Sequence, residues 1–341
     1  KVLAHENIAS REPIYEKYDK QVQGRVNVES GVADSGVLTP FNSTDYPREI
    51  RKVGIALSTD HNPRYSMISP YWGGVNAVVE AMRNVASVGA TPHAITDCLC
   101  YGNPEKPKQM WEFVEGTRGI SEACNAITLK DNPSYPTPII AGNVSFYNES
   151  KNGPIPPSPI VSCLGRLKDI DYVLPMDFQS SGSDILMVGE RKDELGGSIY
   201  YQLLGELGAN VPKPDFVEVR SQIFAITDCA EGGLILSCHD ISDGGIATSI
   251  AEMTFRKNIG CFVKIPGDLQ DHKILFSETG GFVIETEKRN TENVMKVFKA
   301  HGLNVSKIGE TGGEYVQLNE TIKVKVGEAK HRWENGLREK L

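Results

Sequence analysis

Two stretches of the chain combine a carboxylate with neutral oxygen and amide groups, which are the groups that hold nucleotides and Mg²⁺ in proteins. The first stretch is ITDCLCYGNPEKP, residues 95–107, in which Asp97 is flanked by apolar residues of a predicted strand. Burying a carboxylate is costly unless it is paired with a cation or hydrogen-bonded. Asp97 therefore requires a partner, and Mg²⁺, a nucleotide hydroxyl or a neighbouring arginine would each serve.

The second stretch is AGNVSFYNES, residues 141–150, where polar groups interrupt an apolar strand. Asn143, Ser145 and Asn148 supply neutral donors and acceptors, and Gly142 lets another group approach the backbone closely. Such surroundings suit Mg²⁺ that is bound mainly through phosphates and water, with one or two protein ligands. A polar strand end at a sheet edge is the alternative interpretation.

Two predicted strand-to-helix junctions have the composition of phosphate-binding loops. Residues 57–74 (LSTDHNPRYSMISPYWGG) place a polar loop and Gly73-Gly74 after a strand, and Arg64 adds a cation. Residues 237–253 (SCHDISDGGIATSIAEM) repeat this arrangement. Free N–H groups and the helix dipole favour an anion at such a place. An ordinary tight turn explains the double glycines as well.

Three residues of these junctions have side chains that could bind a metal or transfer a proton. Asp60 and His61 lie together in the first junction, and His239 lies in the second. A turn aspartate that caps local N–H groups is an equally good interpretation of Asp60. A histidine at a strand end that is bonded to a neighbouring acid is more often structural, and we expect this for His239.

The elements that must position these residues alternate between strands and helices, which predicts an α/β protein with layered sheets and helices. We expect Trp111, Val114, Ile120 and Ala123 to face inward from a long helix, and the strand that contains Asn143 to be buried on both faces. The predicted strands are 52–58, 93–99, 137–148, 184–190, 234–240, 261–265 and 280–287, and the predicted helices are 73–89, 109–126, 196–208, 215–230, 246–256 and 292–300.

The length of 341 residues predicts two domains with two hydrophobic cores. The periodic pattern is lost between residues 165 and 183, which indicates the junction. We expect a linker over 1–20, an N-terminal-type domain over 21–172 and a C-terminal-type domain over 173–341. The start at Lys1 without a methionine reads like the interior of a longer protein.

Composition and motifs exclude several classes of protein. The net charge of -8 argues against a nucleic-acid binder, and no apolar run approaches the roughly 20 residues that span a membrane. Seven cysteines without a C-x-x-C pair indicate reduced thiols in a cytoplasmic protein. The chain contains no Walker A loop, Rossmann fingerprint, serine-hydrolase elbow or H-E-x-x-H motif.

Several long motifs together resemble the C-terminal half of the synthetase subunit of phosphoribosylformylglycinamidine synthase. The resemblance implies the fold of the aminoimidazole ribonucleotide synthetase superfamily. In that fold an N-terminal sheet domain forms a barrel with a partner copy, and a C-terminal sheet-and-helix domain follows. The motifs are HENIASREPIYEKYDKQVQG, DHNPRYSMISPYWGG, TDCLCYGNPEKP, GISEACNAI, GNVSFYNES and HDISDGGIATSIAEM.

The resemblance also implies an ATP-dependent ligase of purine biosynthesis. Such an enzyme converts formylglycinamide ribonucleotide (FGAR) to the amidine: ATP and Mg²⁺ activate the amide oxygen as an iminophosphate, and ammonia from a glutaminase subunit displaces phosphate. The partners implied are the N-terminal half of the same synthetase, the glutaminase subunit and a small bridging subunit. Neither nucleic acid nor a membrane is expected as a partner.

Four residues of this chain match functional positions of the family. Asp97 and Gly142 match ATP contacts, Asn143 matches a Mg²⁺ ligand and Ser145 matches a substrate contact. The family's catalytic histidines have no counterpart here, because TDHNPR around His61 differs from the active pattern, so no catalytic residue is expected in this chain. The alternative is a non-catalytic half that holds a structural nucleotide.

Overall fold

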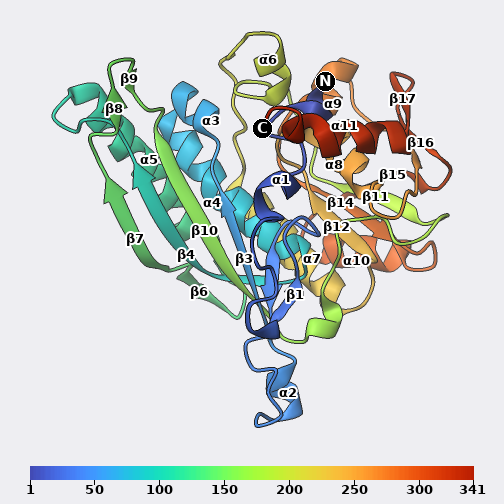
Figure 1. The fold of residues 1–341 in the computed structure, drawn as a ribbon. Coiled ribbons are helices and arrows are strands. Elements are labelled where there is room, and N and C mark those ends of the chain that lie inside the picture. The colour runs from blue at the N-terminus through green and yellow to red at the C-terminus, as the bar shows by residue number, and fades with distance from the viewer.

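Two mixed β-sheets, each covered by helices, form the chain (Figure 1), and the computed structural model describes all of residues 1–341. The first sheet has the strand order β1-β2-β3-β10-β4-β7, and most neighbouring strands in it run antiparallel. Its strands are β1 (Val26–Val28), β2 (Gly36–Leu38), β3 (Gly54–Asp60), β4 (Thr91–Cys100), β7 (Ile139–Ser145) and β10 (Ser158–Leu167). The short strands β5 (Thr128–Leu129), β6 (Asn132–Pro136), β8 (Glu149–Ser150) and β9 (Gly153–Pro154) form two separate ribbons.

The helix α4 is the central element of the first domain. It is preceded by α3 (Pro63–Ile68), spans Pro70–Ser87 and is capped by the Ser69 side chain, which accepts from the Trp72 N–H. Of its 18 residues 14 are buried, because it packs on the first sheet, on α5 (Pro107–Ala126) and on the second domain. Short helices α1 (Glu12–Tyr15) and α2 (Arg48–Arg51) complete this part of the chain.

The double glycine Gly73-Gly74 lies inside α4 and not at its start, so its interpretation as part of a phosphate loop was wrong. A side chain at Gly74 would overlap the carbonyl oxygen of Gly116 on α5. The glycines instead let the two helices approach closely. This is a helix-packing role, and it also explains the error in α5.

Two of the four α5 residues predicted to face inward are exposed. Ile120 and Ala123 are buried, but Trp111 and Val114 are 54% and 48% exposed. The buried stripe of α5 continues from Ile120 toward its N-terminal end through Gly116, three to four residues apart, and the two large side chains fall outside it.

The strand β7 is also more exposed than predicted. It pairs only with β4 and so forms an edge of the sheet, and six of its seven residues are exposed. The prediction of a strand buried on both faces was therefore wrong. An apolar run fits an edge strand as well as a central one, and only the topology distinguishes the two.

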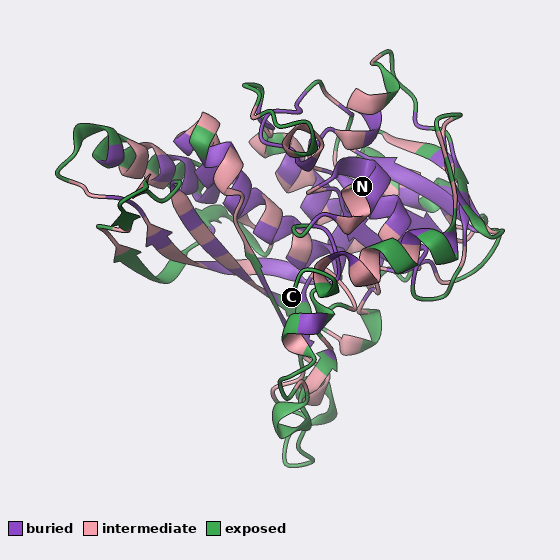
Figure 2. Cartoon of the chain, turned by 45° about the horizontal axis from the view of Figure 1, so that its top comes forward, coloured by how far each residue is buried: buried purple, intermediate pink, exposed green.

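The second sheet has helices on both faces. Leu186 and Val188 of β11 (Asp184–Val188) face a cluster with α7 (Phe216–Glu231) and α10 (Thr291–Ala300), whereas Ile185 and Met187 face a cluster with α8 (Gly245–Met253), α9 (Asp271–Phe276) and α11 (Val326–Arg338). Figure 2 shows both layers as buried. The other strands are β12 (Ser237–Asp240), β13 (Cys261–Val263), β14 (Phe282–Thr286), β15 (Val305–Thr311), β16 (Tyr315–Leu318) and β17 (Ile322–Lys325), in the order β12-β14-β11-β15-β13-β16-β17.

The hydrophobic cores do not divide at the domain junction. One cluster of 38 buried residues joins the first domain to the α7 and α10 side of the second sheet, and a second cluster of 21 residues lies entirely in the second domain. The helix predicted over 196–208 is reduced to α6 (Ile199–Leu203), since Gly205 and Gly208 adopt left-handed conformations. No helix combines the length and apolarity needed to cross a membrane.

The first 16 residues pack on the C-terminal helix. The turn η1 (Val2–Ala4) contacts α11, the Ser10 N–H donates to the Trp333 carbonyl at 3.1 Å, and Glu16 pairs with Arg338. Both termini therefore lie on the second domain (Figure 1). The division at 20 and 172 stays a prediction.

The glycine contact between α4 and α5 makes a testable prediction. We expect Gly74→Ala to lower the free energy of unfolding by about 1–3 kcal/mol, because the new methyl group forces the helices apart. Urea unfolding of the whole chain measures this. The control is Gly327→Ala in α11, where a side chain would meet no atom within 4 Å. Equal midpoints for the two variants would contradict the packing role.

Candidate functional site

The four predicted site residues lie side by side on two parallel strands. In the pairing of β4 with β7, Asp97 is opposite Gly142, Cys98 is opposite Asn143 and Cys100 is opposite Ser145. The register places all four near the carboxyl ends of both strands, where loops 101–106 and 146–148 begin. The structure thus brings together residues that are 45 or more positions apart in the sequence.

The four residues nevertheless divide between the two faces of the sheet. Asp97 is paired with Val161 of β10, which is fully buried, so its side chain lies on the helix-covered face. Side chains alternate along a strand, so Asn143 and Ser145 lie on the opposite face, with Cys98 and Cys100. A ligand that contacts both sets must reach around the edge of β7.

Asp97 and Gly142 fit one another closely. A side chain on Gly142 would overlap the Asp97 carboxylate, so glycine is what leaves room for it. Partial burial raises the pKa of the Asp97 carboxyl, and no cation contributes to that shift. The arginine partner considered for Asp97 is therefore absent, and the carboxylate remains available to a ligand.

Ser145 is held in place by the turn that follows it. The Asn148 side-chain amide donates to the Tyr101 carbonyl at 3.0 Å and to the Ser145 carbonyl at 2.8 Å, and the Ser145 hydroxyl donates to Asn148 Oδ1 at 3.3 Å. These bonds tie the end of β7 to the end of β4. Asn148 is thus a positioning residue for the strand ends.

The face that bears Asn143 is unusually apolar for an exposed surface. Leu57 of β3 is 53% exposed and Val144 and Ile140 of β7 are 48% and 60% exposed. The Cys98 and Cys100 sulfur atoms lie 3.7 Å apart, and all seven cysteines are free thiols. No helix of this chain covers the face (Figure 1). Contiguous exposed apolar surface of this kind marks an interaction surface.

Neither predicted phosphate loop is open to an anion. Arg64 donates to the Gly197 and Glu206 carbonyls. In the second junction the buried Glu278 carboxylate accepts the N–H groups of Gly244 and Ile199, each at 2.8 Å. A carboxylate of the protein therefore occupies the place expected for a phosphate.

The two histidines of these junctions have different surroundings. Both ring nitrogens of His61 lack a hydrogen-bond partner, and burial lowers its pKa to about 4. His239 is buried, with Nδ1 2.7 Å from Asp34 and Nε2 3.1 Å from Glu252. These two carboxylates raise the pKa of His239 despite its burial. The ion-paired environment agrees with the structural role expected for His239.

A cluster of buried carboxylates between the domains was not predicted from the sequence. Burial, with the mutual repulsion of the acids, raises the pKa of Asp60 to about 8 and that of Asp240 to about 7. The pKa of Glu80 is also raised well above its usual value. Asp34, His239 and Asp240 have ligand atoms within 4.8 Å of one another, as in a metal site. Only the pairing of residues about 180 positions apart reveals the cluster.

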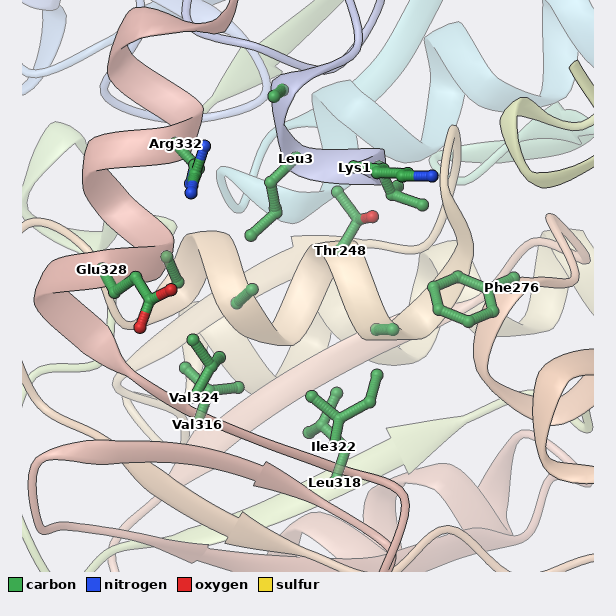
Figure 3. A pocket seen from close by; sticks show the side chains of 15 residues that line it. Lys1, Leu3, Thr248, Phe276, Val316, Leu318, Ile322, Val324, Glu328 and Arg332 are labelled. Atoms are coloured by element: carbon green, nitrogen blue, oxygen red, sulfur yellow. The ribbon is translucent and has the colours of Figure 1, made fainter. Parts of the chain in front are cut away.

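A separate apolar pocket lies on the second domain (Figure 3). Its cavity of about 560 Å³ opens between η1, α8, α11 and the β16–β17 hairpin. Val316, Leu318 and Ile322 form its floor, and Thr248, Glu328 and Arg332 are among its few polar groups. None of the predicted site residues lines it, so it is not the predicted nucleotide site.

Sequence relatives carry one name. The subunit PurL of phosphoribosylformylglycinamidine synthase from Methanothrix thermoacetophila is 43% identical over 100% of this chain and 44% of its own length. The PurL subunit from Thermomicrobium roseum is 34% identical over 98% of this chain and 44% of its own length. The chain thus spans less than half the length of these relatives.

Solved structures have the same fold. Thermotoga maritima PurL complexed with FGAR superposes with a TM-score of 0.75 at 18% identity, over 96% of this chain and 52% of that one. The same protein complexed with ADP gives 0.68 at 19% identity, over 87% and 46%. The protein tt0281 from Thermus thermophilus gives 0.59 at 18% identity, over 84% and 89%.

The family models divide the chain as the two sheets do. The N-terminal domain of AIR synthase related proteins matches residues 34–167, and the C-terminal domain matches residues 180–318. The predicted fold class and the resemblance to the phosphoribosylformylglycinamidine synthase family are thereby confirmed. The chain belongs to the AIR synthase related proteins, as a member similar to part of the PurL subunit.

Proposed function

We propose that this chain forms part of an ATP-dependent ligase that converts FGAR to its amidine in purine biosynthesis. The single observation that carries the proposal is the register of β4 with β7, which aligns Asp97, Gly142, Asn143 and Ser145. Support comes from the names of the relatives and from the relatives' complexes with FGAR, ADP and ATP. We place the protein in the cytoplasm, in keeping with its seven free thiols.

The chain's own residues would bind and orient the reactants. The neutral Asn143 amide oxygen fits Mg²⁺, which prefers oxygen ligands and takes few of them from the protein when phosphates are present. The unpaired Asp97 carboxylate and the open backbone at Gly142 would contact the nucleotide, and the Ser145 hydroxyl would contact the substrate. When bound, Mg²⁺ would neutralise phosphate charge, and positioning would supply most of the remaining catalysis.

The exposed face of the first sheet supports a partner. Asn143 and Ser145 lie beside the apolar residues Leu57 and Val144 on a face that no helix covers. We propose that the remaining part of the synthetase covers this face, so that the two sheets form a barrel and the site is completed between them. A glutaminase subunit and a bridging subunit would then deliver ammonia.

The buried carboxylates favour a second candidate function. Asp60, Glu80 and Asp240 hold protons at neutral pH that a divalent cation would displace. This half of the synthetase would then hold a Mg²⁺–nucleotide as a fixed structural element without turning it over. Tight binding of ADP and Mg²⁺ to this chain without hydrolysis is the expected result, and calorimetry that detects no binding would remove this candidate.

The first prediction concerns the outer face of the sheet edge. In a complex reconstituted from this chain, the rest of the synthetase and the glutaminase, we expect Asn143→Ala with Ser145→Ala to lower kcat/KM for FGAR at least about tenfold, since a Mg²⁺ ligand and a substrate contact are lost. Amidine formation is the measurement. Asn132→Ala with Ser134→Ala, the same changes on the exposed strand β6, is the control. Full activity of the site variant would contradict the assignment.

The second prediction concerns the contact between Gly142 and Asp97. A methyl group at position 142 overlaps the Asp97 carboxylate. We therefore expect Gly142→Ala to raise KM for ATP several-fold in the same complex while the chain stays folded. Asp97→Asn, which keeps the shape and removes the charge, should also weaken ATP binding. Unchanged KM for ATP in both variants would exclude these residues from the nucleotide site.

The third prediction concerns the pH dependence of stability. The raised pKa values of Asp60 and Asp240 mean that the folded chain binds more protons than the unfolded chain, whose aspartate pKa is about 3.9, between about pH 4 and pH 8. Stability is therefore lost as the pH rises through this range. Without Mg²⁺, we expect a lower Tm at about pH 8 than at about pH 6, with a smaller difference in Asp60→Asn.

The control for this measurement is Asp268→Asn, which removes an exposed carboxylate of the second domain. It should keep the pH dependence of the unaltered chain. If Asp60→Asn and Asp268→Asn lose the same stability between the two pH values, the buried cluster does not govern the dependence.

A further inference from the structure

A buried arginine between the two domains lacks a hydrogen-bond partner. Arg83 of α4 is 3% exposed, and its Nε has no hydrogen-bond partner. The nearest carboxylate oxygens belong to Asp240 and Glu80, each at 3.8 Å, which is too far for a hydrogen bond. A buried guanidinium with unsatisfied N–H groups is costly and calls for an explanation, such as a bound molecule.

Arg83 lines a small polar cavity on the side away from those acids. The cavity measures about 30 Å³ and lies between α4 of the first domain and the start of α7 and two loops of the second. Ligand sites often form at such domain interfaces. Only one of its 14 lining residues is hydrophobic: Asn76, Arg83, Glu190, Lys192, Glu194, Pro212, Lys213, Pro214, Asp215, Glu218, Val219, Gln222, Thr279 and Gly280.

The inner end of this cavity carries uncompensated positive charge. The Arg83 guanidinium lies where a side chain of residue 280 would be, so Gly280 makes room for it. Beside it, Arg191 donates to the Gly280 carbonyl at 2.9 Å. Burial, and then the charge of Arg83, lower the pKa of Arg191 to about 9. An anion at this end would relieve the repulsion between the two guanidinium groups.

Two lysines complete a set of cations, whereas the nearby acids are engaged by the protein. Lys192 and Lys213 line the cavity, and no carboxylate oxygen lies within 4.0 Å of either ammonium group. Glu194 accepts from the Lys213 N–H at 3.1 Å and from the Thr279 hydroxyl at 2.6 Å. Asp215 caps α7 by accepting two N–H groups at 2.9 Å. The cations are thus the groups that remain open to a ligand.

A larger groove adjoins the cavity and has room for the body of a ligand. Its volume is about 630 Å³, and it shares Glu190, Lys192, Asp215, Glu218 and Gln222 with the inner cavity. Hydroxyl and amide groups line the rest, together with a few apolar residues. Carboxylates and amides at this place suit a ligand that carries several hydroxyl groups.

We propose that this cavity and groove bind a phosphate monoester with a hydroxyl-rich body. The phosphate would contact Arg83, Lys192 and Lys213, and hydroxyl groups would donate to Glu190 and accept from Ser221. No lining residue belongs to β4 or β7, so the site is separate from the proposed nucleotide edge. It is also independent of the proposed ligase reaction, and its test needs no activity.

The test is calorimetric titration of this chain with ribose 5-phosphate, inorganic phosphate and ribose. We expect ribose 5-phosphate to bind most tightly and ribose not to bind. Lys192→Met with Lys213→Met should weaken ribose 5-phosphate at least about tenfold, since two charge-assisted contacts are lost. Lys151→Met with Lys323→Met makes the same change in net charge at two exposed residues that line neither cavity and should leave binding within about twofold.

Two results would overturn the proposal. The first is the absence of saturable ribose 5-phosphate binding below about 1 mM, and the second is equal weakening in the two lysine pairs. Substitution of Arg83 itself would leave Asp240 and Glu80 without their cation and could unfold the chain. A crystal of the unaltered chain soaked in ribose 5-phosphate replaces that variant: phosphate density on Arg83 supports the site, and ordered water alone in the cavity contradicts it.

Discussion

The burial of carboxylates between the two domains is the constraint on which the rest of the structure depends. Asp60 ends β3 of the first sheet and Asp240 ends β12 of the second, and both are buried only because the domains close over them. The cost is offset by groups from α4: Asn84 donates to Asp60, and Arg83 lies near Asp240. The helix α4 must therefore pack on both domains, and this is why one hydrophobic cluster runs across the junction.

The proposed nucleotide edge depends on a second constraint, the alternation of side chains along a strand. Because Asp97 and Asn143 are one position apart in register, they lie on opposite faces. The helix-covered face supplies a partly buried carboxylate, and the open face supplies neutral ligands. A site that uses both requires another surface over the open face, where apolar residues such as Leu57 are exposed. Function and partner therefore follow from the same geometry.

The sequence predicts local elements well where the signal is local. Asp215 before an apolar periodic segment predicts α7, and the N–H groups that it accepts confirm the cap. Properties set by distant contacts were missed. The apolar run of β7 does not reveal an edge position, and nothing near Trp111 shows that glycines define the buried stripe of α5. The carboxylate cluster joins residues from both halves, so no motif contains it.

The buried Glu278 explains why a phosphate-like loop need not bind phosphate. Its carboxylate accepts the N–H groups at the starts of α8 and α6 and the Tyr65 hydroxyl. A phosphate at this junction would have to displace an internal anion that already satisfies those donors, and repulsion would oppose it. At Arg83 the situation is reversed, since the donor is buried and the acceptor is missing. The places where the protein has not supplied its own counter-group are therefore the places where a ligand is expected.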